Sequence, residues 1–269
     1  MKTSSAIFAM LAVPAAMACP RRPKPSTTTS AAVSTVASTT IPSSVSSASS
    51  LPSSSASSAS SESTAVPVVQ STAVTGKSTF YGGNLNGGTC SFTTYTLPSG
   101  IYGTAFSGSA WDSAEHCGAC LEVTANGKSI TVMIVDECPE CDEGHLDLFQ
   151  NAFQVLSPSS TDILSTSYTF VECPISSPLI LHNKSGTSAY WFSMQVVNAN
   201  EAVSKLEVST DGGSTWKSTT RQNYNFFENS SGFGTDTVTV RVTSESGSTV
   251  VVKNVSVASD SQVTAGSNF

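Results

Sequence analysis

Six of the seven cysteines of this chain lie between residues 90 and 173, and none follows them. Two pairs, Cys117 with Cys120 and Cys138 with Cys141, have the C-x-x-C spacing that also fits a zinc ribbon. The pairs lie among strand-like segments rather than on short zinc-binding knuckles. The choice between disulfides and zinc therefore depends on the compartment in which the chain folds.

The N-terminus predicts secretion. Lys2 precedes an apolar run over residues 6–15, and the small residues 16–18 form a cleavage pattern, which is typical of a signal peptide over residues 1–18. The run is too short to span a bilayer, and the C-terminal residues lack the hydrophobic tail of a lipid-anchor signal. Cys19 raises the alternative of a bacterial lipoprotein, but the leader matches that signal poorly. We expect a secreted protein, extracellular or associated with a cell wall, with no membrane partner.

Disulfides are favoured over zinc, because they form and persist in an oxidising compartment. We therefore expect no metal and no cofactor. Six cysteines allow many pairings, so the sequence leaves the connectivity open. Our working prediction is the set Cys90–Cys117, Cys120–Cys173 and Cys138–Cys141.

A segment rich in Ser and Thr follows the predicted leader. From Ser26 to about Thr75 the composition is mostly Ser and Thr with Ala, Val and a few prolines. Such a segment buries too little apolar surface to offset the entropy of ordering it. We predict a disordered linker over residues 19–75, with the composition of an O-glycosylated stalk; a plain flexible tail is the alternative.

The rest of the chain is long enough for two small domains, predicted over residues 76–174 and 175–269. The whole chain carries 12 Lys and Arg against 19 Asp and Glu, a net charge of −7. Without a basic patch to attract phosphates, nucleic acid is disfavoured as a partner. A neutral polymer such as a polysaccharide suits this charge balance better, and we expect a monomer.

The first of these domains has the pattern of a small β-barrel. Two apolar or alternating runs, Ala119–Thr124 and Ser129–Val135, flank Asn126-Gly127, a strong hairpin signal. Further strands are predicted at Ser78–Tyr81 and Ser167–Glu172, with a helix at Asn151–Leu156. Short strands with glycine turns predict a closed barrel whose rim carries the functional side chains.

Two acids lie close together in this domain. Asp136 ends the apolar run Ile130–Val135 at the start of an apparent loop, and Asp147 lies between Leu146 and Leu148. An acid between two leucines of a strand faces away from the core. If both acids meet in one groove, they form a site for a polar neutral ligand or for proton transfer; solvated charges at loop ends are the alternative.

Several motifs of this domain, in this order, resemble the expansin family, and its microbial and fungal members (the loosenins among them) most closely. They are Thr79–Gly83, Cys117–Cys120, Val135–Pro139, His145–Leu148 and Asn151–Phe153. The resemblance implies a six-stranded double-psi β-barrel, related to family 45 glycoside hydrolases and to some lytic transglycosylases.

The resemblance also implies roles for individual residues. Asp147 matches the aspartate that expansins need for wall loosening and the general acid of the related hydrolases. Asp136 and Thr79 match its neighbours in the groove, with Tyr81 nearby. Two positions depart from the family: Phe149 stands where Ser is usual, and Cys138 replaces a groove tyrosine of bacterial relatives, so substrate preference stays open.

Hydrolysis by an inverting mechanism needs a second carboxylate, about 6.5–9.5 Å from the acid. The strand that supplies it in the hydrolases carries no acid here, so the candidates are Asp136, Asp112 and Glu115. Asp136 would serve only if it lay across the bound chain rather than beside Asp147. We therefore expect wall loosening without hydrolysis. The alternatives are an endoglucanase or lytic transglycosylase, and a non-catalytic wall-binding protein.

The second domain is predicted to be an all-β, immunoglobulin-like sandwich. Period-two patterning marks Ala189–Val197, Val203–Ser209, Thr237–Thr243 and Thr249–Val257. Tyr190, Trp191 and Tyr224 resemble the aromatic face of the cellulose-binding domain that follows the barrel in expansins, and Lys184 matches a basic residue of that face. Cellulose or another cell-wall glucan is therefore the expected partner.

Three further expectations concern single side chains of this domain. Adjacent strand residues face opposite ways, so Tyr190 and Trp191 both reach a ligand only at a strand start or a bulge, and we favour Trp191. Trp216, after a turn, is predicted to be core. N-glycosylation sequons begin at Asn183, Asn229 and Asn254.

Overall fold

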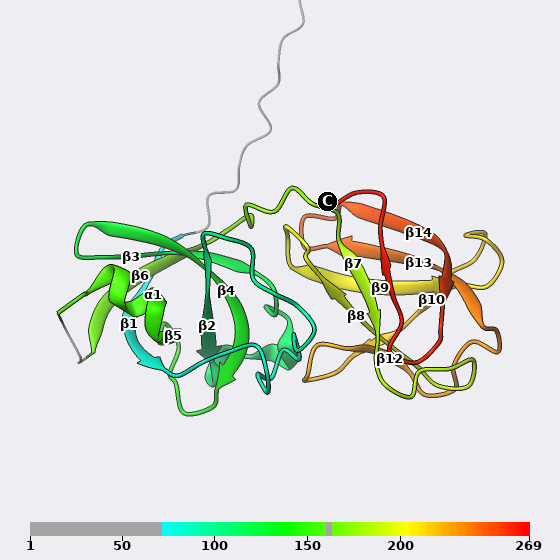
Figure 1. Ribbon diagram of the computed structural model, residues 1–269, viewed down its shortest axis with the longest axis horizontal. Helices are drawn as coiled ribbons and strands as arrows, with labels where there is room; N and C mark the ends of the chain where they lie inside the picture. Colours follow the sequence, from blue (N-terminus) through cyan, green and yellow to red (C-terminus); the bar gives the residue numbers. More distant parts are fainter. Residues whose placement is uncertain (1–71, 160–162) are drawn as a thin grey trace, which may run out of the picture. The chain divides into compact units, whose positions relative to one another are not determined.

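The computed structural model describes residues 72–159 and 163–269 (Figure 1). The predicted signal peptide and almost all of the predicted linker lie outside these residues. Within them the fold is all-β with one short α-helix, α1 (Gln150–Leu156), and two 3-10 turns. This confirms the predicted fold class.

Six strands form a closed barrel in the order β1-β5-β2-β4-β3-β6 (Figure 1). They are β1 (Val74–Tyr81), β2 (Ile101–Ser107), β3 (Cys120–Ala125), β4 (Lys128–Cys138), β5 (Leu146–Phe149) and β6 (Leu164–Val171). β1 runs parallel to β5, and β2 runs parallel to β4. The barrel interior is filled by fully buried apolar side chains, among them Leu121, Ile134, Leu146 and Leu148. Helix α1 packs against the barrel, where Phe153 contacts Phe80 at 4.9 Å between ring centroids.

Strand β4 extends beyond its predicted end. It continues through Asp136 to Cys138, because β2 pairs with it past a bulge between Thr104 and Ala105. Asp136 therefore lies within a strand, opposite Ala105, and not in a loop as the sequence predicted.

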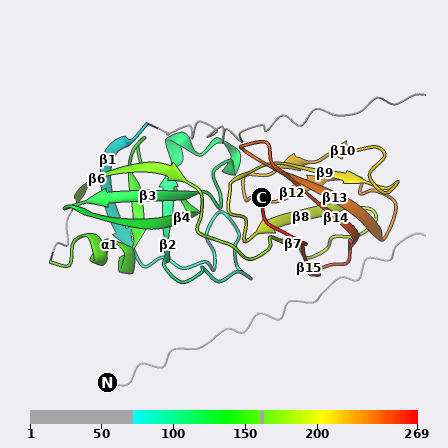
Figure 2. The ribbon, with the colours of Figure 1, turned by 90° about the horizontal axis from the view of Figure 1, so that it is seen from above.

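The second group of strands forms two sheets. One has the order β10-β9-β13-β14 and the other β11-β12-β8-β7-β15. Their bounds are β7 (Ile180–Asn183), β8 (Phe192–Val197), β9 (Val203–Ser209), β10 (Lys217–Ser218), β11 (Thr220–Arg221), β12 (Phe227–Asn229), β13 (Thr237–Ser244), β14 (Thr249–Ser256) and β15 (Gln262–Thr264). Figure 2 shows β15 beside β7 at the edge of the second sheet. The core of this part includes Phe192, Met194, Leu206 and Val240.

Trp216 lies outside that core, so its predicted core role is wrong. It is half-buried just before the short edge strand β10, and the guanidinium of Arg241 lies 4.3 Å from its ring centroid. The ring thus packs against a partly exposed side chain of β13, outside the buried core.

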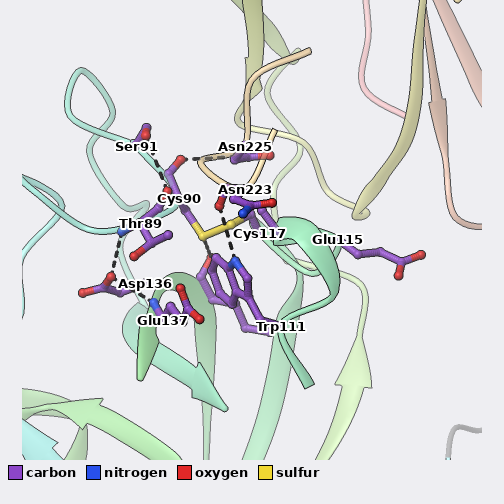
Figure 3. Close-up of a disulfide and its surroundings, with 12 residues drawn as sticks. Thr89, Cys90, Ser91, Trp111, Glu115, Cys117, Asp136, Glu137, Asn223 and Asn225 are labelled. Atoms are coloured by element: carbon purple, nitrogen blue, oxygen red, sulfur yellow. Dashed lines mark hydrogen bonds between the residues drawn. A yellow bond between two sulfur atoms is a disulfide. The ribbon is translucent and has the colours of Figure 1, made fainter. Parts of the chain in front are cut away.

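The structure contains the disulfides Cys90–Cys117, Cys120–Cys173 and Cys138–Cys141, which are the pairs named above. Cys90–Cys117 joins the long loop after β1 to the segment before β3 (Figure 3). The other two disulfides each join a strand end to a loop. Cys120 begins β3 and Cys138 ends β4, and their partners Cys173 and Cys141 lie outside the strands.

Buried polar contacts connect the barrel to the sheets that follow. The carbonyl oxygen of Cys90 accepts hydrogen bonds from Gln195 Nε2 at 2.8 Å and from Asn225 Nδ2 at 3.4 Å. Trp111 Nε1 donates to the carbonyl of Asn223 at 3.3 Å (Figure 3). The predicted domain boundary at residue 174 lies between β6 and β7; the division into two domains stays a prediction.

Candidate functional site

Strands β1 and β5 place Thr79 beside Asp147 on the outer face of the barrel. The two residues are direct partners in the parallel ladder. Leu146 and Leu148 are fully buried, so Asp147 between them points outward and is half-buried, as predicted. The Thr79 hydroxyl donates to Asp147 Oδ1 at 2.5 Å. Thr79 therefore fixes the position of this carboxylate.

His145 extends this arrangement; the motif His145–Leu148 contains it, but the sequence predicts no role for it. Its Nε2 lies 3.0 Å from Thr79 Oγ1. The single hydroxyl hydrogen of Thr79 is directed to Asp147, so Nε2 must carry a hydrogen and donate it. Burial lowers the pKa of His145, Lys77 lowers it further, and Asp147 acts in the opposite direction. We assign a neutral imidazole above pH 6.5, donating from Nε2. The sequence signal that could have found it is the spacing of two between His145, just before β5, and Asp147 within it.

Asp136 lies on the same wall of the barrel as Asp147. Ala105 of β2 pairs with Asp147 on one side and with Asp136 on the other. Paired residues of neighbouring strands share a face, so both acids lie side by side, with Cα atoms roughly 10 Å apart from the usual strand spacing. The structure thus brings the predicted residues Asp147, Asp136, Thr79 and Tyr81 to one wall.

The carboxylate of Asp136 is held by three donors. Its Oδ1 accepts from the backbone N–H groups of Thr89 at 2.7 Å and Glu137 at 2.9 Å (Figure 3). Its Oδ2 accepts from the Tyr81 hydroxyl at 3.2 Å. Burial, and then the charge of Asp136, raise the pKa of Tyr81 far above its usual range. Tyr81 therefore remains a neutral donor, and Asp136 anchors both this phenol and the loop at Thr89.

The candidate second carboxylates Asp112 and Glu115 belong to other surroundings. Asp112 is exposed in a 3-10 turn. The charge of Glu115 acts on Arg221 and Glu245. In the described residues, no hydrogen bond or ion pair joins either acid to Asp147.

The sheets carry a second group of predicted residues. Lys184 Nζ lies 5.8 Å from the ring centroid of Trp191 and 5.2 Å from that of Tyr224. The Tyr224 hydroxyl donates to Glu228 Oε1 at 2.8 Å. Burial and this contact raise the pKa of Tyr224 to about 12. Trp191, Tyr224 and Lys184 therefore form one partly exposed patch, the aromatic patch.

Tyr190 and Trp191 are both accessible because they lie at a tight turn that immediately precedes β8 (Phe192–Val197). Ser188 and Trp191 form an isolated antiparallel bridge, and Tyr190 lies in the turn between them. The side chain of Tyr190 is 81% exposed, the most exposed of the large apolar residues in the described chain. Both side chains can therefore reach a ligand because they lie at the start of a strand, which is one of the two cases that the sequence allowed.

Comparison with known proteins agrees with this geometry. A protein-family model described as lytic transglycolase matches residues 76–168. Expansin-like protein 5 of Dictyostelium discoideum is 30% identical over 207 residues, which are 74% of this chain and 86% of that protein. The chain belongs to the expansin family. Expansin-YoaJ of Bacillus subtilis is 30% identical over 65% of this chain and 75% of its own length. The chain spans smaller shares, 61% and 51%, of Dictyostelium expansin-like proteins 1 and 3.

Solved expansin structures share the fold. The apo expansin of Clavibacter michiganensis is 29% identical, with a TM-score of 0.66 over 73% of this chain and 98% of its own. A point mutant of that expansin in complex with cellohexaose is 28% identical, with the same TM-score and coverage. The narrower placement among fungal expansins and loosenins stays a prediction.

Both departures from the expansin pattern have structural consequences. Cys138 is only 7% exposed and is bonded to Cys141, so this position supplies a crosslink in place of a sugar-stacking ring. Phe149 is 9% exposed, and its ring lies edge-on to Tyr81 at 5.6 Å between centroids. The departures thus change the wall beside Asp147 without removing the acid.

One of the three sequons is incompatible with a glycan in the folded protein. Asn183 is 1% exposed, and its Nδ2 lies within hydrogen-bond distance of Ser256 O, Ala258 O and Ser261 Oγ. Its predicted glycosylation is therefore wrong, because the amide that would carry the sugar is buried and bonded. Asn229 and Asn254 are partly or fully accessible and stay predictions.

Residues 72–159 and 163–269 lack two further features. No group of three or more His, Cys, Asp or Glu side chains is placed to hold a metal ion. No helix there has the length and hydropathy needed to cross a membrane.

Proposed function

We propose that this expansin is secreted, binds cellulose or a related cell-wall glucan, and loosens it without hydrolysis. The barrel wall around Asp147 contacts one glucan chain, and the aromatic patch docks the protein on the polymer. Solved structures support the ligand class, because a related expansin was crystallised with cellohexaose. The disulfides suit an oxidising extracellular compartment.

The position of Asp136 beside Asp147 carries the non-hydrolytic part of the proposal. An inverting hydrolase needs a base that activates water on the face of the sugar opposite the acid. Here both acids flank Ala105 on one wall, and both oxygens of Asp136 already accept hydrogen bonds. Asp147 can therefore hydrogen-bond or protonate a glycosidic oxygen, whereas Asp136 is badly placed to direct water at the same bond.

Loosening then follows from exchange of hydrogen bonds. Asp147 accepts from glucan hydroxyls, and Thr79 and His145 keep its carboxylate in position. One exchanged hydrogen bond contributes only about 0.5–1.5 kcal/mol. The protein would thus release a chain from its neighbours by several small displacements along the wall, with no covalent step.

The aromatic patch supplies the docking contact. Sugar rings present C–H groups that stack on aromatic faces, while their hydroxyls stay hydrated. Tyr190 and Trp191 lie next to each other in the chain, and Lys184 connects Trp191 with Tyr224. Docking through this patch would keep the barrel close to the polymer, so weak contacts at Asp147 act at high local concentration.

Cellulose paper tests the proposal directly. Strips are incubated with the protein, their breaking force is measured, and new reducing ends in the same sample are counted. The expected result is a lower breaking force with no reducing ends above those of buffer. Reducing ends that rise in proportion to the weakening would overturn the non-hydrolytic mechanism.

Lytic transglycosylase activity is the second candidate, since the matching family model carries that description. This reaction needs one acid, because a hydroxyl of the sugar itself attacks in place of water. Its products form an intramolecular anhydro bond and leave no new reducing end, so mass spectrometry is required to see them. Anhydro-sugar fragments from peptidoglycan, chitin, xyloglucan or cellulose would establish this candidate and displace the first.

A further inference from the structure

A groove of about 680 Å³ lies beside Phe149, on the barrel, and none of the residues assigned above to glucan binding lines it. The loop between β1 and β2 forms most of its lining, with the start of β2 and of α1. Its polar lining includes Asn84, Asn86, Tyr102 and Asn151. Its size falls within the usual range of ligand sites, roughly 300–1,000 Å³.

The groove is uncharged. Among the described residues that line it, none is Asp, Glu, Lys, Arg or His. Asn84, Asn86 and Asn151 are exposed to solvent, and Tyr102 is half-buried. Amides and phenol hydroxyls both donate and accept hydrogen bonds. Together with aromatic carbon, they match a ligand that is neutral, rich in hydroxyls and apolar on its ring faces.

Phe149 forms the wall that the groove shares with the Asp147 site. Residues two apart in a strand share a face, so Phe149 lies on the same face of β5 as Asp147, although its side chain is buried. Two glycines make room for the ring: a Cβ added to Gly83 or Gly103 would lie only 2.4 or 2.5 Å from it. The ring therefore occupies a fitted slot, with the Asp147 wall on one side and the uncharged groove on the other.

We propose that this groove is a second saccharide site, which binds uncharged pyranose units of the glucan whose neighbouring part lies on the Asp147 wall. The proposal rests on the proposed function, since it takes that occupant to be a neutral glycan. The units in the groove are either a continuation of the main chain or a side branch. Their chemistry is the same, and the two sources are separable by experiment.

Nuclear magnetic resonance of the full secreted chain, labelled with ¹⁵N, tests this. Cellohexaose is titrated in one arm, and a xylose-substituted cello-oligosaccharide in the other. The expected result is saturable shifts of the backbone amides of residues 84–86 and 96–102. Shifts with both ligands assign the groove to the main chain, and shifts with the substituted ligand alone assign it to the branch.

Variants inside and outside the groove show whether these amides report binding in the groove itself. Asn151→Ala should raise the Kd read from these amides about 2–10-fold, the range of one hydrogen bond. Thr96→Trp should raise it further by filling the groove. Gln154→Ala, at an exposed site of α1 outside the groove, should leave it unchanged.

The proposal is overturned if neither ligand shifts these amides, or if neither groove variant weakens the binding that they report. Its failure is distinct from failure of the proposed function. If the amides of the groove do not shift but the protein still loosens cellulose, only the second site is disproved. If the amides of the groove show saturable shifts but the protein does not loosen cellulose, only the proposed function is disproved.

Discussion

The hydroxyl of Thr79 donates to the carboxylate of Asp147 over 2.5 Å, across the parallel pair β1 and β5. A hydrogen bond to a charged group contributes about 1.5–3 kcal/mol when it is formed. This bond fixes which way the only carboxylate of β5 points, and the remaining acceptor positions of Asp147 are left for a ligand.

Thr79→Val therefore tests whether the position of Asp147 matters, since it replaces the hydroxyl by a methyl group of similar size. We expect lower loosening activity and a free energy of unfolding lower by about 1–2 kcal/mol. Thr79→Ser keeps the hydroxyl and should retain most of the activity. Breaking force and chemical denaturation measure the two effects. Equal activity of the Val and Ser variants would show that the bond is not needed for loosening.

His145 gives the protein a pH-dependent contribution to stability. Burial lowers its pKa in the folded protein below the ordinary value of 6.5. The unfolded chain therefore takes up a proton first as the pH falls, which favours unfolding. We expect stability to be unaffected by His145 above pH 6.5 and to decline below it, until the folded protein also binds the proton.

Thermal unfolding between pH 8 and pH 4.5 measures this contribution, with His145→Gln as the comparison. Gln keeps an N–H donor for Thr79 but does not titrate. The decline in Tm below about pH 6.5 should be smaller in the variant than in the wild type. Identical pH profiles of the two proteins would remove the assigned role of the imidazole.

Trp191 and Trp216 provide a matched pair for the docking role. Both are half-buried tryptophans, but Trp191 belongs to the aromatic patch and Trp216 lies against Arg241. Trp191→Ala should weaken binding to insoluble cellulose by at least about fivefold, a loss of more than ~1 kcal/mol. Trp216→Ala should leave binding unchanged. Depletion isotherms on cellulose measure the affinity of both variants. Equal losses of affinity would show that the aromatic patch is not the docking site.

The disulfides should differ in their contribution to stability. They span sequence separations of 53, 27 and 3 residues for Cys120–Cys173, Cys90–Cys117 and Cys138–Cys141. In the chain-entropy model these loops contribute about 4, 3.5 and 2 kcal/mol, respectively. Denaturant unfolding of three paired Cys→Ala variants measures the order. If the variant without Cys138–Cys141 lost the most stability, native contacts rather than loop closure would determine what each disulfide contributes.

Much of the fold was readable from the sequence where the side-chain pattern is regular. Apolar and polar residues alternate from Leu206 to Ser209, beside a turn signal, and β9 has the predicted bounds Val203–Ser209. β2 was not predicted, because six of its seven residues, from Ile101 to Ser107, are buried and include Gly103, which hides the alternation. The end of β4 was missed because pairing with β2, a contact distant in sequence, keeps Asp136 in the strand.

The sequence predicted which residues form the site, but it did not predict how they are placed relative to one another. The motifs named Asp147, Asp136, Thr79 and Tyr81, but whether the two acids lie beside or across from each other depends on the strand order of the barrel. The burial of Asn183 and the cation beside Trp216 likewise come from residues far along the chain. Such contacts leave no local pattern.

Asp147→Asn tests the central claim most directly, with Asp142→Asn as its control. Asp142 is exposed in the loop before β5, and its side chain has no bonded partner among the described residues. Breaking force of cellulose paper and binding to the same cellulose are measured for both variants and the wild type. We predict that Asp147→Asn loses its weakening of the paper while it binds cellulose as before, and that Asp142→Asn matches the wild type. An Asp147→Asn protein that weakens paper as well as the wild type would contradict the proposal.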